Sequence, residues 1–244
     1  PAGAIGRLGG LRELDLSCNA LEGEIPETLG SCTKLMVLNL ANNKFEGEIP
    51  ESLGFLTNLQ ILSLHHNNLQ GPIKDTFSCL TNLRTLSLSH NTFGGPIPVW
   101  VNNLQKLEHL CLQGNQLQGD LPSGLFELSK LQVFYAFQNA LSGEISESIT
   151  KLTRLKLLNL MDNNMTGRIP PSVGNMTKLE LLLLGHNNFY GPLPPTLANL
   201  TRVRDLHIVD GPRSRQLRLP RGFKRSAFER IFITGPQHLG LNNT

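Results

Sequence analysis

Leucine recurs along this chain in a fixed arrangement of apolar and polar positions. The segments that begin at Leu11, Leu35 and Leu59 read Leu-x-x-Leu-x-Leu, and the arrangement returns every 24 residues as far as Leu179. Alternating apolar residues predict a short β-strand with one buried face, because successive side chains of a strand point to opposite faces. A fixed period of this length predicts a solenoid of stacked units, none of which buries its apolar face alone.

Other positions repeat in register with the leucines. Asn occupies the ninth position of every unit from Asn19 to Asn187, and Gly occupies the thirteenth from Gly23 to Gly191. We expect the Asn amide to satisfy backbone groups where the chain leaves the strand, and Gly to permit a turn that a Cβ would hinder. Ile-Pro pairs such as Ile25-Pro26 keep the next segment extended. Apolar residues at helical or 3₁₀ spacing, such as Leu53 and Leu56, then return to the core.

Whole units can be compared with a known repeat. LDLSCNALEGEIPETLGSCTKL, LNLANNKFEGEIPESLGFLTNL and LNLMDNNMTGRIPPSVGNMTKL resemble the plant-specific leucine-rich repeat, LxxLxLxxNxLxGxIPxxLxxLxx. Plant receptor-like kinases, receptor-like proteins and polygalacturonase-inhibiting proteins share this repeat. The resemblance implies an α/β leucine-rich-repeat solenoid with a curved parallel β-sheet on its concave face. Short 3₁₀ or helical segments and extended segments are expected on the convex face.

The repeats divide the chain into three parts. Residues 1–10 fit the end of a preceding repeat, residues 11–202 form eight 24-residue repeats, and residues 203–244 begin with a degenerate ninth repeat. Solenoids need a polar cap at each end, and residues 1–10 do not provide one. We therefore expect that a natural N-terminal part precedes them, with a partner covering this end as the alternative.

Charge separates the repeats from the C-terminal segment. Residues 1–202 carry 14 basic and 16 acidic side chains, whereas residues 203–244 carry 8 and 3. This segment fits a C-terminal cap whose charges stay in water, and the alternative is a docking segment for an acidic partner or an anionic membrane surface. Nucleic acid is the least favoured partner, because no recognisable reading module accompanies the charge. The candidate docking residues are Arg213, Arg215, Arg218, Arg221, Lys224 and Arg225.

Apolar residues occupy strand positions that are expected to face solvent in the sixth to eighth repeats. They are Tyr135, Phe137, Met161 and Leu183. Outward positions of adjacent strands form columns on the concave face, where repeat proteins bind their ligands, and exposed apolar patches mark contact sites. We predict that these four residues bind the ligand, with irregular edge packing as the alternative explanation.

Three further candidate ligand-binding residues of the concave face are histidines of the third and fourth repeats, His65, His66 and His90. Neighbouring strands could bring His66 and His90 together. A metal site needs converging ligands and a supporting shell of hydrogen bonds, and no carboxylate or thiol is placed to complete one. We therefore predict solvated histidines and no metal, with pH-sensitive binding near pH 6 as the alternative.

Catalytic motifs are absent from the sequence. HExxH, GxSxG, a Walker loop and GxGxxG after a strand do not occur, and the repeat accounts for the glycines. We predict that the chain is not an enzyme and holds no cofactor.

The cysteines and the glycosylation motifs indicate different compartments. Stacked strands would place Cys18 about 19 Å from Cys111, and Cys32 about 10 Å from Cys79, beyond the roughly 7 Å that a disulfide spans. Unpaired cysteines favour a reducing compartment, whereas the resemblance implies an extracellular or cell-surface protein, so the compartment stays open. Candidate glycosylation sites are Asn164, Asn175 and Asn199, with a fourth acceptor motif at Asn242.

Two hypotheses of function follow. The first is a non-catalytic protein- or peptide-binding module of a plant receptor-like or inhibitor-like protein, which recognises its ligand on the concave face. The second is an intracellular scaffold or peripheral subunit of a large assembly, which docks through its N-terminal end and its basic tail.

Overall fold

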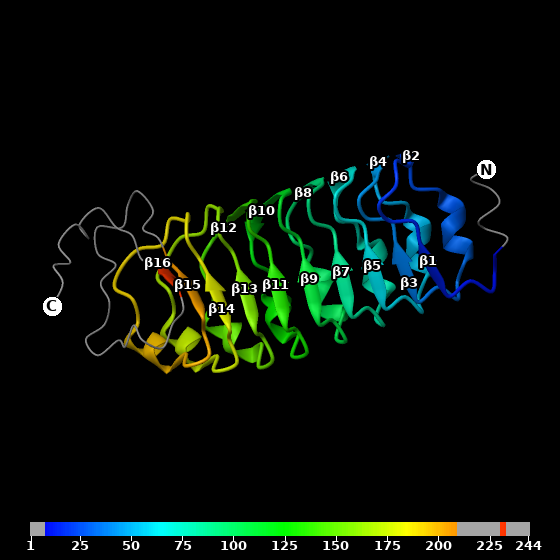
Figure 1. Ribbon diagram of the computed structural model, residues 1–244. Helices are drawn as coiled ribbons and strands as arrows, with labels where there is room; N and C mark the ends of the chain where they lie inside the picture. Colours follow the sequence, from blue (N-terminus) through cyan, green and yellow to red (C-terminus); the bar gives the residue numbers. More distant parts are fainter. Residues whose placement is uncertain (1–7, 209–229, 233–244) are drawn as a thin grey trace.

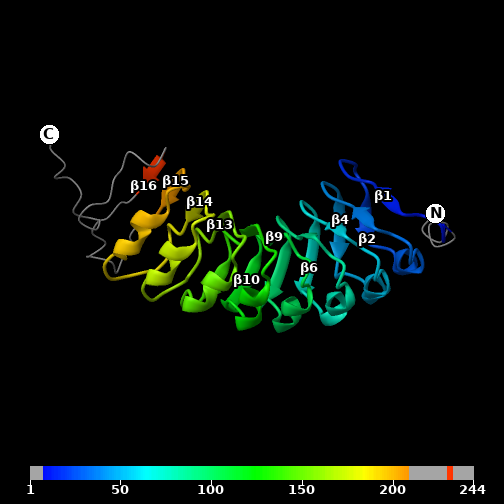
Figure 2. The same ribbon diagram turned by 90° about the horizontal axis from the view of Figure 1, so that it is seen from below.

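The computed structural model describes residues 8–208 and 230–232. Successive repeats stack into an elongated solenoid that bends into an arc (Figures 1 and 2). Strands line the inner side of the arc and short helical turns line its outer side (Figure 2). The predicted leucine-rich-repeat solenoid is confirmed.

The concave face is a parallel sheet of 10 strands within the described residues. Its register pairs equivalent positions of neighbouring repeats, such as Leu38 with Leu62 and Leu62 with Leu86. Residues 24 apart in the chain therefore lie side by side on this face. The strands, in spatial order, are β1 (Glu13–Asp15), β3 (Val37–Asn39), β5 (Ile61–Ser63), β7 (Thr85–Ser87), β9 (His109–Cys111), β11 (Val133–Tyr135), β13 (Leu157–Asn159), β14 (Leu181–Leu183), β15 (Asp205–His207) and β16 (Arg230–Phe232).

Each repeat crosses the convex face as a five-residue 3₁₀ helix. In most repeats the residue before this helix is an extended Pro, as at Pro26 and Pro50, whose fixed φ and missing N–H suit the start of a helical turn. Neighbouring helical segments need more room than the spacing of about 4.8 Å between neighbouring strands. The stack therefore curves, with the strands on its inner side. The helices are η1 (Glu27–Ser31), η2 (Glu51–Phe55), η3 (Asp75–Cys79), η4 (Val99–Asn103), η5 (Ser123–Glu127), η6 (Glu147–Lys151), η7 (Pro171–Asn175) and η8 (Pro195–Asn199).

A second parallel sheet, of six strands in the described part of the chain, follows one long edge of the solenoid (Figure 1). The sequence predicted only extended segments here. Stacking brings these segments together, and their backbone groups pair because unpaired buried N–H and C=O groups are costly. The strands are β2 (Glu22–Glu24), β4 (Lys44–Gly47), β6 (Asn68–Pro72), β8 (Thr92–Gly95), β10 (Gln116–Asp120) and β12 (Ala140–Ser142).

The core lies between the two sheets and the 3₁₀ helices, and the repeated Asn closes one side of it. Asn67 Nδ2 donates to the carbonyl oxygens of Leu40 and Leu64, each at 3.0 Å. Its Oδ1 accepts a hydrogen bond from the backbone N–H of Phe45 at 3.0 Å. Each such amide links its own strand exit to the preceding repeat, which confirms the expected Asn ladder.

The two ends of the described solenoid differ in how their last strand is covered. At the first repeat, Leu14 and Leu16 are only partly buried, and Leu8 and Leu21 are exposed. At the other end, β16 pairs with β15, and Arg230 donates to both carboxylate oxygens of Asp205, at 2.8 and 3.0 Å.

Candidate functional site

The register of strands β11, β13 and β14 sets apolar side chains in columns on the concave face. Val133 pairs with Leu157, which pairs with Leu181. In the next outward column, Tyr135 and Leu183 flank Asn159. Phe137 and Met161 follow β11 and β13 at equivalent positions of adjacent repeats. All these apolar side chains are half-buried, so each keeps a surface that a ligand can cover. We call this surface the apolar patch: Val133, Tyr135, Phe137, Leu157, Met161, Leu181 and Leu183.

The patch is larger than the sequence predicted. Tyr135, Phe137, Met161 and Leu183 were expected on this face. Their neighbours Val133, Leu157 and Leu181 were not singled out, because in a leucine-rich strand they resemble core residues. Their position in the repeat could have identified them. They occupy the third position, whose side chain points outward because the side chain at the fourth position is buried. Val133, Leu157 and Leu181 therefore form a single column of the concave sheet.

Aromatic and thiol groups form the N-terminal border of the patch. The rings of Tyr135 and Phe137 meet edge to face with their centroids 6.3 Å apart. Burial, and to a lesser extent Cys111, raises the pKa of the Tyr135 phenol. Burial raises the pKa of the Cys111 thiol to about 11. Both groups are therefore neutral at pH 7, and Tyr135 presents a hydroxyl that can donate a hydrogen bond to a ligand.

A polar pair lies on the other side of the patch. His186 Nδ1 contacts Asp162 Oδ1 at 2.8 Å, and both side chains remain accessible. His207 lies beyond, with its ring centroid 5.8 Å from that of His186. Burial lowers the pKa of His207, His186 lowers it further, and Asp162 opposes both effects. This border offers a carboxylate and imidazoles next to the apolar columns.

The three histidines of the third and fourth repeats form a separate cluster. The rings of His66 and His90 stack with their centroids 4.2 Å apart, and His65 Nδ1 lies 3.2 Å from Ser87 Oγ. Burial, followed by neighbouring histidines, lowers the pKa of His65 and of His90. No group of three or more metal-ligating side chains occurs within residues 8–208 and 230–232. The cluster lies outside the apolar patch, and the structure does not bring the two together.

The remaining candidate residues fall in different places. Asn175 and Asn199 end η7 and η8 on the convex face, and Asn164, which follows the buried Asn163, is also exposed. None of the cysteines, all of which are in the described residues, forms a disulfide. No helix among the described residues is long and apolar enough to cross a membrane. The basic residues from Arg213 to Arg225 lie outside the described residues.

Comparison with known families matches most of the repeats. Leucine-rich-repeat models match residues 33–93 and, in a second set, residues 10–32, 106–128, 154–176 and 178–200. No curated protein matches the chain.

Solved structures match over nearly the whole described solenoid. The plant peptide hormone receptor RGFR1, in complex with RGF2, is 36% identical with a TM-score of 0.82, over 84% of this chain and 33% of the receptor chain. The Arabidopsis receptor kinase HAESA, in complex with the peptide hormone IDA and the co-receptor SERK1, is 35% identical with a TM-score of 0.82, over 86% and 35%. A plant ice-binding protein is 27% identical with a TM-score of 0.77, over 96% and 76%.

This chain spans about a third of the length of the receptor chains that it matches. The family models nevertheless match more than half of it, in the same register as the strands and the Asn ladder. The chain therefore belongs to the leucine-rich-repeat family, with repeats of the plant receptor-like type.

Proposed function

We propose that this chain is a non-catalytic recognition module that binds a peptide or protein ligand on its concave face. The module is part of a receptor-like or inhibitor-like protein. The similar structures of RGFR1 and HAESA are complexes with peptide hormones, which supports a ligand of this class. The fold by itself does not select the ligand, because a plant ice-binding protein shares it.

The observation that carries the proposal is the apolar patch. Half-buried apolar side chains in adjacent columns lose little conformational entropy when a ligand covers them, because packing already orders them. Aromatic residues contribute most of the binding energy at many protein interfaces, and Tyr135 and Phe137 lie together at one border. The patch crosses three neighbouring strands, β11, β13 and β14. The Asp162–His186 pair lies at its side, and this arrangement suits an extended segment lying across the repeats.

The test selects ligands from a displayed library of random linear peptides and compares variants for binding. Tyr135→Ala with Phe137→Ala should raise the Kd of the selected peptides at least about tenfold, as expected for loss of aromatic anchors. A matched control is Phe55→Ala with Val99→Ala, because these two side chains are 67% and 77% exposed on the convex helices η2 and η4. The control should leave the Kd unchanged. Equal affinity of wild type and patch variant, with both folded by circular dichroism, would place the binding surface elsewhere.

A further inference from the structure

An exposed tyrosine lies on the long edge of the solenoid that carries the second sheet. Tyr190 of the eighth repeat is 46% exposed, and its backbone N–H donates to the carbonyl oxygen of Gly167 in the seventh repeat at 2.9 Å. The same position of the other repeats is polar or glycine: Glu22, Glu46, Gln70, Gly94, Gln118, Ser142 and Thr166. The repeat therefore does not require an aromatic side chain here, and the core does not bury it.

The tyrosine stands at one end of a pocket that crosses four repeats. The pocket has a volume of about 710 Å³ and extends from Asp120 in the fifth repeat to Tyr190 in the eighth. Between these two residues lie the starts of the 3₁₀ helices η6 and η7. We call this cavity the Tyr190 pocket, and its polar lining side chains are Asp120, Glu144, Ser146, Glu147, Arg168 and Tyr190.

One polar side chain from each of three successive repeats lies along the pocket. Asp120, Glu144 and Arg168 all occupy the fourteenth position of their repeats. A Cβ added to Gly143 would lie 2.5 Å from the carboxylate of Asp120, and one added to Gly167 would lie 2.6 Å from that of Glu144. Glycine at these two positions therefore leaves the space that the carboxylates of the preceding repeats occupy.

Most polar groups of the Tyr190 pocket are available to a ligand. Within the described residues, the side chains of Glu144, Glu147 and Arg168 form no hydrogen bond or ion pair. The carboxylate of Asp120 accepts a hydrogen bond from Ser142 Oγ at 2.9 Å through one of its oxygens. Carboxylates accept hydrogen bonds and a guanidinium donates them. The pocket therefore offers both kinds of group to a ligand.

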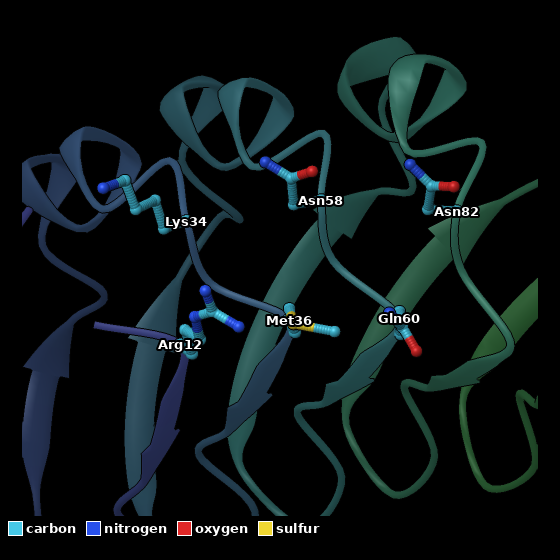
Figure 3. Close-up of a pocket in the computed structure, with 6 residues that line it drawn as sticks. All are labelled: Arg12, Lys34, Met36, Asn58, Gln60 and Asn82. Carbon is cyan, nitrogen blue, oxygen red and sulfur yellow. The ribbon is translucent and has the colours of Figure 1, made fainter. Parts of the chain in front are cut away.

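A second pocket, at the turns between the 3₁₀ helices and the concave strands, has a different character. Its volume is about 330 Å³, and the six residues that line it include no aromatic side chain (Figure 3). The amides of Asn58 and Asn82 already donate to the backbone oxygens of Thr33 and Thr57, at 2.9 and 2.8 Å. Of these two pockets, the Tyr190 pocket is the one that combines available polar groups with an exposed aromatic ring.

We propose that the Tyr190 pocket binds a neutral oligosaccharide. The C–H face of a sugar ring packs on an aromatic ring, and sugar hydroxyls, which donate and accept, bond to carboxylates and to a guanidinium. An elongated pocket suits several linked sugars. The carboxylates of Asp120, Glu144 and Glu147 repel an acidic chain, and Arg168 in the same row repels a basic peptide. The pocket lies away from the concave face and does not depend on the proposed peptide ligand.

Such a sugar chain has two sources, a free oligosaccharide and a glycan attached to Asn164. Asn164 is exposed and begins an Asn-x-Thr acceptor motif. Its backbone N–H donates to the carbonyl oxygen of Leu141 at 2.8 Å, and Thr166 of the same motif pairs with Glu144 of the pocket. The acceptor motif therefore borders the pocket.

The first experiment measures binding of cellohexaose, mannohexaose and galactohexaose by calorimetry to the whole chain produced without glycans. Tyr190→Ala removes the aromatic ring, whereas Tyr190→Phe keeps the ring and removes only the hydroxyl. Met36→Ala with Gln60→Ala is the control, because both side chains line the other pocket. Thermal unfolding first establishes that every variant is folded.

We expect at least one of these neutral oligomers to bind wild type and to lose affinity roughly tenfold in Tyr190→Ala. Tyr190→Phe and the control should bind it nearly as well as wild type. Equal affinity of wild type and Tyr190→Ala, or no binding of any of the three oligomers, would overturn the proposal. Tighter binding of oligolysine or of polygalacturonate, lost in Tyr190→Ala, would overturn it in favour of a charged partner.

A second experiment distinguishes the two sources in the chain secreted from plant cells. It follows release of the Asn164 glycan by an endoglycosidase under native conditions. Slower release from wild type than from Tyr190→Ala would identify the attached glycan as the occupant of the pocket. Equal rates, or a chain that carries no glycan at Asn164, would assign the pocket to the free oligosaccharide that binds in the first experiment.

Discussion

At the residue scale, the Asn at the ninth position of each repeat forms hydrogen bonds with the backbone of two neighbouring repeats. Asn163 is buried, and its Nδ2 donates to the carbonyl oxygens of Ala136, Leu160 and Met161 at 3.0–3.2 Å. Its Oδ1 accepts from the backbone N–H of Leu141 at 2.9 Å. A carboxylate would lack the donors and an apolar residue would lack both kinds of group. The repeated Asn therefore supplies an acceptor for a buried backbone N–H of the preceding repeat and a donor that the carbonyl oxygens share with neighbouring amides.

We predict that Asn163→Ala lowers the free energy of unfolding by about 2–4 kcal/mol, because the buried N–H of Leu141 loses its acceptor and three carbonyl oxygens each lose one hydrogen bond. Asn19→Ala is the matched control. Asn19 occupies the same position of the first repeat, but it is exposed, and among the described residues its side chain bonds only to the carbonyl oxygens of Leu16 and Ser17. Its loss should cost less than about 1 kcal/mol. Urea unfolding followed by circular dichroism measures both, and similar losses in the two variants would contradict this account.

At the element scale, the spacing of the 3₁₀ helices depends on glycine at a few contacts. A Cβ added to Gly174 in η7 would lie 2.2 Å from the backbone oxygen of Thr196 in η8. The same contact occurs between η1 and η2, where a Cβ on Gly30 would lie 2.4 Å from the oxygen of Ser52. Backbone atoms cannot rotate away as a side chain can. These helices therefore pack closer together than a side chain at this position allows.

We predict that Gly174→Ala destabilises the chain by about 1–3 kcal/mol, the usual cost of overpacking. Gly94→Ala is the comparison, because a Cβ there would meet nothing closer than the oxygen of Gln116 at 4.0 Å. Gly94 lies in strand β8, where Ala costs no strain and removes freedom from the unfolded chain, so stability should stay equal or rise slightly. The midpoints of thermal unfolding decide between the two. A Gly174 variant as stable as wild type would show that η7 and η8 can separate at no cost.

At the scale of the whole molecule, stability depends on stacking. Each repeat contacts only its neighbours, so an inner repeat is covered on both sides. In the first repeat of this chain, Leu14 and Leu16 are only partly buried, whereas Leu110 and Leu112 of the fifth repeat are 1% and 2% exposed. Local opening should therefore begin at the first repeat and spread inward.

Hydrogen exchange of two equivalent amides tests this gradient. The N–H of Leu16 donates to the oxygen of Asn39 at 2.8 Å, and that of Leu112 donates to the oxygen of Tyr135 at 2.7 Å. The two hydrogen bonds have nearly the same length, so only their place in the stack differs. We predict that Leu16 exchanges at least about 100-fold faster in this chain, because its repeat opens without global unfolding. Equal rates would indicate that the solenoid opens as a single unit.

The sequence by itself determined the features that repeat. Strand positions follow from Leu-x-x-Leu-x-Leu, the polar ladder follows from Asn at a fixed position, and the solenoid follows from the 24-residue period. Each of these depends on interactions within a repeat or between equivalent positions, so one period predicts them all. Tyr135, Phe137, Met161 and Leu183 could be assigned to the concave face for the same reason, although their role in binding stays a prediction.

Only the tertiary structure decided the features that depend on contacts between different repeats and on the path of the backbone. Extended segments became a second sheet once stacking placed them side by side, and the open choice between helix and 3₁₀ turn was settled by packing against neighbouring turns. Val133, Leu157 and Leu181 joined the apolar patch because the register places their outward faces in one column. Periodicity fixes which residues are equivalent, but three-dimensional packing decides which equivalent rows become neighbours.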